Sequence, residues 1–142
     1  MIVLDTNVIS EAMRGPRADP LVRAWLRSLP APPVTTVINR AEILAGVALL
    51  PAGDRRDRLR GAALTAFSGL AVCLPLTPEC ADHYAEIVAD RRRAGRPASS
   101  MDALVAAIVR ESGGRLATRD TNDFAGLGLD LVNPWRTDLP LS

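Results

Sequence analysis

The hydrophobic and polar positions of this chain fall into short apolar runs separated by longer segments of mixed character. Runs of three or four apolar residues bounded by turn residues are typical of strands buried on both faces of a parallel sheet. They predict short strands at residues 2–4, 34–36, 72–74, 115–118 and 129–132.

The longer segments between these runs carry the start and stop signals of helices. Asp19 before Pro20 is an N-cap followed by a first-turn proline, and Gly113-Gly114 closes a very apolar segment. The predicted helices run from the residues after Asp5 to about residue 13, and then over 20–29, 37–50, 54–67, 77–95 and 101–111. Strands that alternate with helices predict a single α/β domain over residues 1–142, with a mostly parallel sheet and right-handed crossovers.

Composition excludes several kinds of chemistry. The chain has 142 residues, of which 48% are hydrophobic and 23% charged, and its formal net charge is +1. These values are those of an ordinary globular domain and do not indicate a basic nucleic-acid-binding tail. All 17 basic residues are arginine, so a P-loop lysine, a Schiff-base lysine and a lysine general base are all excluded.

The two cysteines and the start of the chain bear on its compartment. Cys73 and Cys80 are too few for a zinc or disulfide framework, and Cys73 is expected in the core because it lies in an apolar run. We find no basic-then-apolar leader and no apolar stretch of the 18 residues that a membrane span needs. The expectation is a cytoplasmic protein with no membrane contact.

Nine of the sixteen acidic residues fall into two groups. Five lie on polar, arginine-rich helices, where a solvated surface is expected: Asp54, Asp57, Asp82, Glu86 and Asp90. Three others are lone carboxylates in segments that otherwise look buried, namely Asp5, Glu42 and Asp102. A fourth, Asp120, directly follows a predicted strand.

Each of these four acids also has a purely structural explanation. Asp5 can cap the helix that follows it, Asp102 can be a first-turn carboxylate favoured by the helix dipole, and Glu42 can pair with an arginine. Asp120 can be an ordinary turn aspartate, and Asp123 is a rival for its role in a site.

Taken together, the four acids favour a site. In a parallel sheet, Asp5, Asp102 and Asp120 fall near the carboxyl ends of strands, where ligands bind. Several converging carboxylates cannot all remain ionised without a cation. No cysteine accompanies them, and the only histidine, His83, lies on a solvated helix, so all-oxygen ligands would select Mg²⁺ or Mn²⁺. Such a site polarises phosphates and activates water, as in metal-dependent nucleases.

Several segments, in order along nearly the whole chain, resemble one known family. The residues that carry the resemblance are DTNVISE, RAEILAGVALL, MDALVAAIV, LATRDTNDF and VNPW. They resemble the PIN-domain family, and most of all its bacterial VapC-type toxins of the FitB-like subgroup. The resemblance implies a three-layer α/β/α fold and a Mg²⁺- or Mn²⁺-dependent endoribonuclease. It also implies a homodimer neutralised by a small cognate antitoxin, with a larger toxin–antitoxin complex forming on DNA through the antitoxin.

The resemblance also assigns expected roles by position. Asp5, Glu42 and Asp102 match the three near-invariant catalytic acids, and Asp120 matches the more variable fourth. The metal is expected on Asp5, Asp102 and Asp120, and whether Asp120 or Asp123 completes the site stays open. The supporting polar residues that match the motif are Thr6, Asn7 and Thr118.

Contact with RNA would fall to arginines near the acids. The candidates are Arg91, Arg92, Arg93, Arg96 and Arg119. They could bind phosphates, although the first three equally suit a helix C-terminus. With five aromatic residues in the chain, no base-stacking platform is expected, so recognition would rest on RNA shape and backbone.

Other classes remain as alternatives or are excluded. Haloacid-dehalogenase-type phosphatases need a second acid where this chain has Asn7, and they and receiver domains need a lysine that it lacks. A non-catalytic dimer that binds antitoxin or RNA is an alternative, as is a non-toxin PIN nuclease that processes RNA or acts on DNA. An antitoxin helix could use an apolar groove on the first two helices, or the same side chains could be core: Val8, Ile9, Leu21, Trp25 and Leu26.

Overall fold

Short parallel strands form the centre of the computed structural model, which describes residues 1–136. The strands are β1 (Ile2–Leu4), β2 (Thr35–Thr36), β3 (Cys73–Leu74), β4 (Arg115–Ala117) and β5 (Asp130–Val132). β4 pairs with both β1 and β5, and β2 pairs with β3. A parallel bridge between Val3 and Val34 brings β2 beside β1, with Leu4 N donating to Val34 O at 2.8 Å. The order across the centre is therefore β3-β2-β1-β4-β5.

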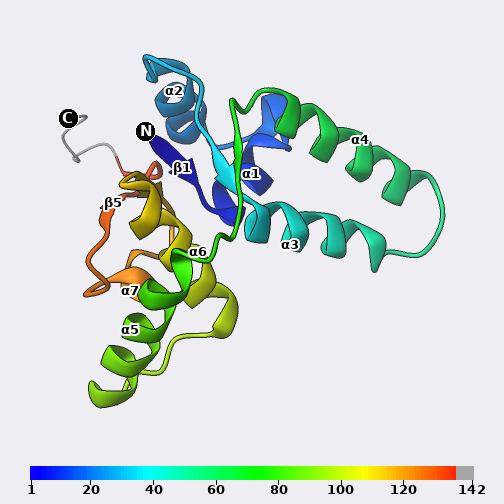
Figure 1. Cartoon of the computed structure of the whole chain (residues 1–142). Helices are drawn as coiled ribbons and strands as arrows, with labels where there is room; N and C mark the ends of the chain where they lie inside the picture. The colour runs from blue at the N-terminus through cyan, green and yellow to red at the C-terminus, as the bar shows by residue number, and fades with distance from the viewer. Residues whose placement is uncertain (137–142) are drawn as a thin grey trace.

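Helices cover both faces of these strands (Figure 1). They are α1 (Thr6–Ala12), α2 (Pro20–Ser28), α3 (Val37–Ala48), α4 (Asp54–Ser68), α5 (Cys80–Arg93), α6 (Ser100–Ser112) and α7 (Thr121–Phe124), with a 3₁₀ turn at Gly15–Arg17. Within residues 1–136, no helix is long and apolar enough to cross a membrane.

Successive strand residues point to opposite faces and so feed two separate cores. On β1, Val3 packs with side chains of α5 and α6, whereas Leu4 packs with those of α1, α2 and α4. On β4, Leu116 and Ala117 divide in the same way. The α/β domain that the pattern predicts, and the three-layer α/β/α arrangement that the family resemblance implies, are therefore confirmed.

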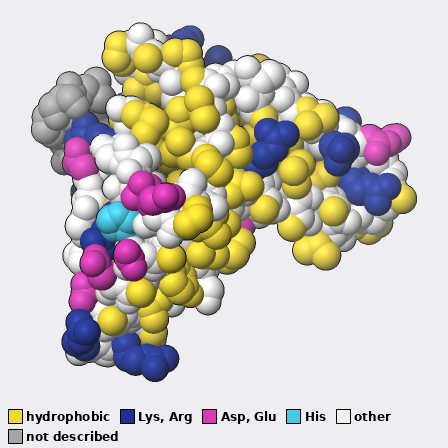
Figure 2. All heavy atoms as spheres, viewed as in Figure 1, with side chains coloured by type: hydrophobic (Ala, Val, Ile, Leu, Met, Phe, Trp, Pro, Cys, Tyr) yellow, Lys and Arg dark blue, Asp and Glu magenta, His cyan; other side chains and the backbone are white. Residues whose placement is uncertain are grey.

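Helices α3 and α4 form an antiparallel arm that extends away from the sheet (Figure 1). The arm keeps apolar side chains in solvent, as Figure 2 shows along its length. Leu49, just after α3, is 86% exposed, and Leu64 on α4 is 45% exposed. Large apolar side chains left in solvent at the tip and along one helix are candidates for contact with another chain.

The predicted strands and helices are present, and the residues predicted to start and stop helices do so. Asp19 caps α2 by accepting a hydrogen bond from Leu21 N at 2.8 Å, and Gly113 ends α6 with a φ of 71°, a conformation that glycine adopts freely. The last six residues of the predicted domain, 137–142, lie outside the described residues.

Three predictions differ from the structure. Cys73 is exposed and not in the core, because β3 is an edge strand that pairs only with β2. Helix α5 begins at Cys80, since Thr77 and Pro78 form a turn in which Cys80 N donates to Thr77 O at 3.0 Å. Helix α7 was not predicted, because its four residues are too few to show a helical period.

Candidate active site

An open cleft of about 540 Å³ lies at the carboxyl ends of β1 and β4. β1 leads directly into Asp5, and β4 leads through Thr118 into Arg119 and Asp120. Glu42 enters from α3 and Asp102 from the first turn of α6. The lining residues are Asp5, Thr6, Asn7, Ser10, Glu11, Arg14, Glu42, Asp102, Arg119, Asp120 and Trp135. All four predicted catalytic acids thus line one cleft.

Asp5 is the most deeply held of these acids, at 7% exposed. Its Oδ1 accepts hydrogen bonds from Thr6 N and Asn39 Nδ2, both at 2.9 Å, and its Oδ2 accepts one from Thr118 Oγ1 at 2.7 Å. The bond from Thr6 makes Asp5 the N-cap of α1. Asp5 therefore fulfils both alternatives that the sequence left open, because it caps a helix and lines the cleft.

Thr118 and Asn7 join the ends of the two strands. The Thr118 hydroxyl, fully buried, donates to Asp5 and accepts from Asp120 N at 3.0 Å and Asn7 Nδ2 at 3.3 Å. Asn7 Nδ2 also donates to Asp120 Oδ2 at 3.2 Å, and Asn7 Oδ1 accepts from Arg119 N at 3.3 Å. These bonds fix Asp120 relative to Asp5.

Thr6 performs a similar task on the other side of Asp5. Its hydroxyl donates to Glu42 Oε1 at 3.2 Å and accepts from Asn39 Nδ2 at 3.0 Å. Asn39 is itself fully buried in α3, where Thr36 caps the helix by accepting from Asn39 N at 3.2 Å. The three supporting residues that the sequence singles out, Thr6, Asn7 and Thr118, all contact one of the acids.

Three of the acids have raised pKa values, and their surroundings explain why. Burial raises the pKa of Asp5 most, the hydrogen bonds from Thr118, Thr6 and Asn39 oppose that shift, and the charge of Asp120 adds to it. Burial also raises the pKa of Glu42, helped by the charges of Asp5 and Asp102. The carboxylates therefore repel one another. No cationic side chain contributes to the raised pKa of Asp5, Glu42 or Asp102.

Asp102 shows the same coupling. Burial is the largest cause that raises its pKa, the hydrogen bond with Ser99 opposes the rise, and the charges of Asp5, Asp123 and Asp120 add to it. The structural explanation for Asp102 was a place in the first turn of a helix, where the helix dipole favours a negative charge. Asp102 occupies that position and lines the cleft as well.

The two candidates for the fourth acid lie in different places. Asp120 lines the cleft and is held by Asn7, as described above. Asp123 lies in the first turn of α7, outside the residues that line the cleft. The geometry therefore favours Asp120, while the charge of Asp123 still reaches Asp102.

The oxygen atoms of the cleft suit a hard cation, but they do not form a complete coordination shell around one position. The acids and their hydroxyl and amide partners offer oxygen ligands of the kind that Mg²⁺ and Mn²⁺ take. Among residues 1–136, no group of three or more His, Cys, Asp or Glu side chains is already gathered at metal-binding distance. Mg²⁺ commonly keeps several waters and uses only one or two carboxylates directly, so the residues fit a water-rich site.

Of the predicted phosphate-binding arginines, only Arg119 lines the cleft. Arg91 is 7% exposed, and its guanidinium donates to the backbone carbonyls of Asp123, Ala125 and Arg96. The prediction that Arg91 binds substrate is wrong, because burial and these carbonyls use it to fasten α5 to the segment around α7.

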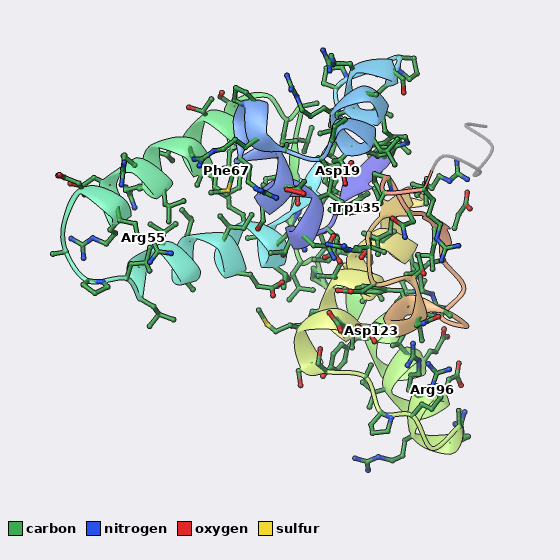
Figure 3. The ribbon with its side chains drawn as sticks, turned by 180° about the vertical axis from the view of Figure 1, so that it is seen from behind. Asp19, Arg55, Phe67, Arg96, Asp123 and Trp135 are labelled. Carbon is green, nitrogen blue, oxygen red and sulfur yellow. The ribbon has the colours of Figure 1, made fainter. Side chains whose placement is uncertain are left out.

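The other three arginines of this group do not line the cleft either. Arg93 pairs with Asp90 at 2.9 Å, and Arg96 donates to Asn122 O at 3.2 Å. Arg92 is exposed on the same last turn of α5 and does not line the cleft. Figure 3 places Arg96 at the far end of α5, well apart from Trp135 at the cleft.

Five residues at or beside the acids were missed in the sequence: Ser10, Glu11, Arg14, Asn39 and Trp135. A signal existed for two of them, since Glu11 and Arg14 follow Asn7 by four and seven residues and so share a helix face with it. Glu11 accepts from Arg14 Nη1 at 3.0 Å. Trp135, which enters the cleft from beyond β5, ends the VNPW segment that carries part of the family resemblance, but nothing in that segment indicates a place in the cleft.

Comparison with known proteins gives consistent matches over nearly the whole chain. The family model described as PIN domain matches residues 2–128. The chain is 41% identical to the plasmid stability protein StbB of Pseudomonas syringae pv. tomato, over 95% of this chain and 99% of that protein. It is 38% identical to the VapC ribonuclease Y4jK of Sinorhizobium fredii, over 95% and 98%.

Toxin FitB of Neisseria gonorrhoeae is 37% identical over 95% of this chain and 99% of its own length. Among solved structures, that of FitAB bound to an IR36 DNA fragment matches with a TM-score of 0.83 and 35% identity, covering 98% of this chain and 99% of the other. Identity at this level over full lengths, together with the same fold, is evidence of common family membership.

Proposed function

This chain belongs to the PIN-domain family, and we propose that it is a metal-dependent endoribonuclease, the toxin of a type II toxin–antitoxin pair. The observation that carries the proposal is the group of carboxylates at the carboxyl ends of β1 and β4. Three of them have pKa values raised by burial and by one another's charges. A protein gains nothing in stability from such a group, so a function explains it better than structure does.

The cofactor we propose is Mg²⁺ or Mn²⁺, held by Asp5, Asp102 and Asp120 through a mixture of direct and water-mediated contacts. A bound divalent cation would supply an activated water and balance the charge of the phosphate. The residues of the chain keep the ligands in place, since Thr118 and Asn39 hold Asp5 and Asn7 holds Asp120. Glu42, held by Thr6, completes the proposed set of catalytic acids.

RNA is the proposed substrate because a relative of 38% identity over nearly the full length is named a ribonuclease. The open cleft at the acids supports a substrate of this size. Cleavage of structured RNA by hydrolysis of its phosphodiester bonds, in the cytoplasm, is the form of the activity that we propose.

A small antitoxin is the proposed partner, and a homodimer is the proposed assembly. FitAB bound to a DNA fragment supports a complex that reaches DNA through the antitoxin. Of the side chains predicted to form an antitoxin groove, Val8, Ile9 and Trp25 are buried core residues, while Leu21 is 40% exposed. The core alternative therefore holds for those three, whereas the half-buried Leu26 lines a small apolar pocket of about 210 Å³ between α1, α2 and α4, which supports docking there. The exposed leucines of the α3–α4 arm support contact with a second copy.

The test is cleavage of a folded RNA by the purified chain with and without Mg²⁺ or Mn²⁺. We expect cleavage that needs the cation and stops when EDTA is added in excess. Full activity in EDTA would contradict the metal mechanism. RNA binding without any cleavage under all conditions would favour the non-catalytic alternative.

The toxin role has its own test in cells. Expression of the chain alone should arrest growth, and co-expression with the product of a short neighbouring reading frame should restore it. An Asp102→Asn variant is the control and should be tolerated. Unimpaired growth with active, soluble protein would contradict the toxin role and leave a PIN nuclease in RNA processing.

A further inference from the structure

The acidic cleft presents a problem for a polyanionic substrate. Its lining contains five carboxylates, Asp5, Glu11, Glu42, Asp102 and Asp120, and only two arginines, Arg14 and Arg119. A bound cation offsets part of this negative charge near the acids, but the RNA backbone on either side must still be attracted. Within the part of the chain that the structure describes, the two arginines are the basic side chains that line this cleft.

Arg119 is held at both ends. Its backbone N–H donates to Asn7 Oδ1 at 3.3 Å, which ties it to the same amide that holds Asp120. Its guanidinium carbon lies 5.1 Å from the centroid of the Trp135 ring, within the range of a cation–π contact. An arginine that is stacked in this way loses less conformational freedom when it grips a phosphate.

Trp135 is in turn fixed to the body of the protein. Its backbone N–H donates to Asn133 Oδ1 at 3.0 Å, and Asn133 is buried. The indole packs against the core cluster formed by β1, β4 and helices α1 to α4. The ring therefore joins a rigid core on one side to a charged side chain at the cleft on the other.

Arg14 lines the same cleft from just beyond the C-terminal end of α1. It follows Asn7 by seven residues, which separates the two by roughly 10 Å along the direction of α1. Its side chain is 59% exposed, and Glu11 accepts from its Nη1 at 3.0 and 3.4 Å. Because those two bonds use one nitrogen of a guanidinium with five N–H groups, Arg14 can bind a phosphate without leaving Glu11.

We propose that Arg14 and Arg119 hold two phosphates of one RNA strand across the acidic cleft, and that Trp135 is the positioning residue for Arg119. This inference rests on the proposed ribonuclease function and adds the residues that bind its substrate. It replaces the predicted cluster at the end of α5, since those arginines are buried, paired or remote from the acids. It also gives a role to an aromatic residue in a chain that has few.

The experiment compares Arg14→Gln, Arg119→Gln, Trp135→Leu and Trp135→Phe in two settings. Binding of a folded RNA is measured in the Asp5→Asn background over a range of salt, and steady-state cleavage is measured in the otherwise unaltered chain. Arg60→Gln, which makes the same charge change on exposed α4, is the matched control. Thermal melts of every variant report on folding.

We expect Arg14→Gln and Arg119→Gln each to raise Kd and KM about tenfold or more, with kcat nearly unchanged. Each should also reduce the slope of log K against log salt by about 0.7 to 0.9, one contact's share, whereas Arg60→Gln should not. Trp135→Leu should match Arg119→Gln, and Trp135→Phe should retain most of the affinity, because phenylalanine still offers a ring face. The double variant Arg119→Gln/Trp135→Leu should bind no worse than Arg119→Gln alone.

Two results would overturn the inference while leaving the proposed function intact. One is Arg14→Gln and Arg119→Gln variants that behave like Arg60→Gln in both Kd and salt slope. The other is a Trp135→Leu effect that is as large in the Arg119→Gln background as in the parent, which would mean a structural role only. A parent that binds RNA but does not cut it would contradict the proposed function, while the binding series would still decide on the two arginines. A chain that does not bind RNA at all would overturn both.

Discussion

Two groups of acids in this molecule have the same chemistry and opposite surroundings. On α5, Glu86 accepts from Arg110 at 2.7 Å and Asp90 pairs with Arg93 at 2.9 Å, all near solvent. Figure 2 shows acidic and basic side chains interspersed on this side of the molecule, around the histidine. In the cleft, by contrast, the hydrogen-bond donors to Asp5 and Glu42 are the neutral groups of threonines, an asparagine and the backbone.

The difference lies in what neutralises each charge. On α5, Glu86 and Asp90 pair with arginines near solvent, so their charges are neutralised without a bound ion. Such exposed pairs contribute little to stability. Asp5, Glu42 and Asp120 are instead oriented by neutral donors, which hold the carboxylates in place without cancelling their charge. Carboxylates that are held in place and keep their negative charge are suited to bind a cation from solution.

Removing the charge of a cleft acid should have its largest effect on the rate of RNA cleavage. Asp5→Asn should reduce RNA cleavage on the order of a thousandfold or more, because it removes a charge that a divalent cation needs. Glu86→Gln on α5 should leave the cleavage rate unchanged and alter the free energy of unfolding by less than about 1 kcal/mol. Rates from a single-turnover RNA digest decide this. An Asp5→Asn protein as active as the parent would mean that Asp5 is only a helix cap.

Adding Mg²⁺ should separate the two groups by stability. Since the folded chain binds the cation and the unfolded chain does not, Mg²⁺ at a hundred times its Kd should stabilise the parent by about 2.7 kcal/mol. The gain should be much smaller in Asp5→Asn and unaltered in Glu86→Gln. Thermal melts with and without Mg²⁺ measure it. Equal gains in all three proteins would place the cation elsewhere.

Thr118→Val tests the neutral donors directly. The substitution keeps the shape but removes the hydroxyl that donates to Asp5 and accepts from Asp120 N. It should cost about 1–3 kcal/mol of unfolding free energy, because a buried carboxylate loses a hydrogen bond. Thr65→Val on exposed α4 is the control and should change stability by about 0.5 kcal/mol or less. Urea unfolding of both variants gives the comparison, and equal losses would contradict the role of Thr118.

The smallest effect is the pH dependence of stability. Because the pKa of Asp5 is raised in the folded chain above its ordinary value of 3.8, the folded state binds more protons than the unfolded state just above that pH. The stability of the metal-free parent should therefore fall, relative to Asp5→Asn, as pH rises from about 3.8 through the raised pKa. Asp5→Asn should be at least as stable as the parent at neutral pH. Denaturant unfolding of both proteins at several pH values tests this, and a difference that runs the other way would contradict it.

Much of the fold could be predicted because its signals are local. Short apolar runs, caps and glycine stops mark nearly every element, and the strand–helix alternation predicts the layers. Cys73 was assigned wrongly because an apolar run does not tell whether its strand lies in the middle or at the outer edge of the sheet. The order of the strands depends on contacts between distant segments, such as β1 with β4, which no local pattern contains.

The candidate site was predictable to the same extent. Lone carboxylates in apolar segments stand out because burial of an unpaired charge is costly, so Asp5, Glu42 and Asp102 could be singled out. Arg91 was misjudged because a basic residue at a helix end looks the same whether it faces water or backbone carbonyls. The contact between Arg119 and Trp135 joins the ends of two strands and lies beyond any short-range pattern.

The hydrogen bond between Thr118 and Asp5 also has a consequence for the time at which the protein becomes active. The two residues are 113 positions apart, and β4 is the strand that completes the sheet beside β1. A ribosome that adds about 5 to 20 residues per second needs on the order of ten seconds to travel from one to the other. When Thr118 is added, the chain already holds Asp5, Glu42 and Asp102, and Asp120 follows two residues later. The proposed site is therefore incomplete until synthesis of the chain is almost finished.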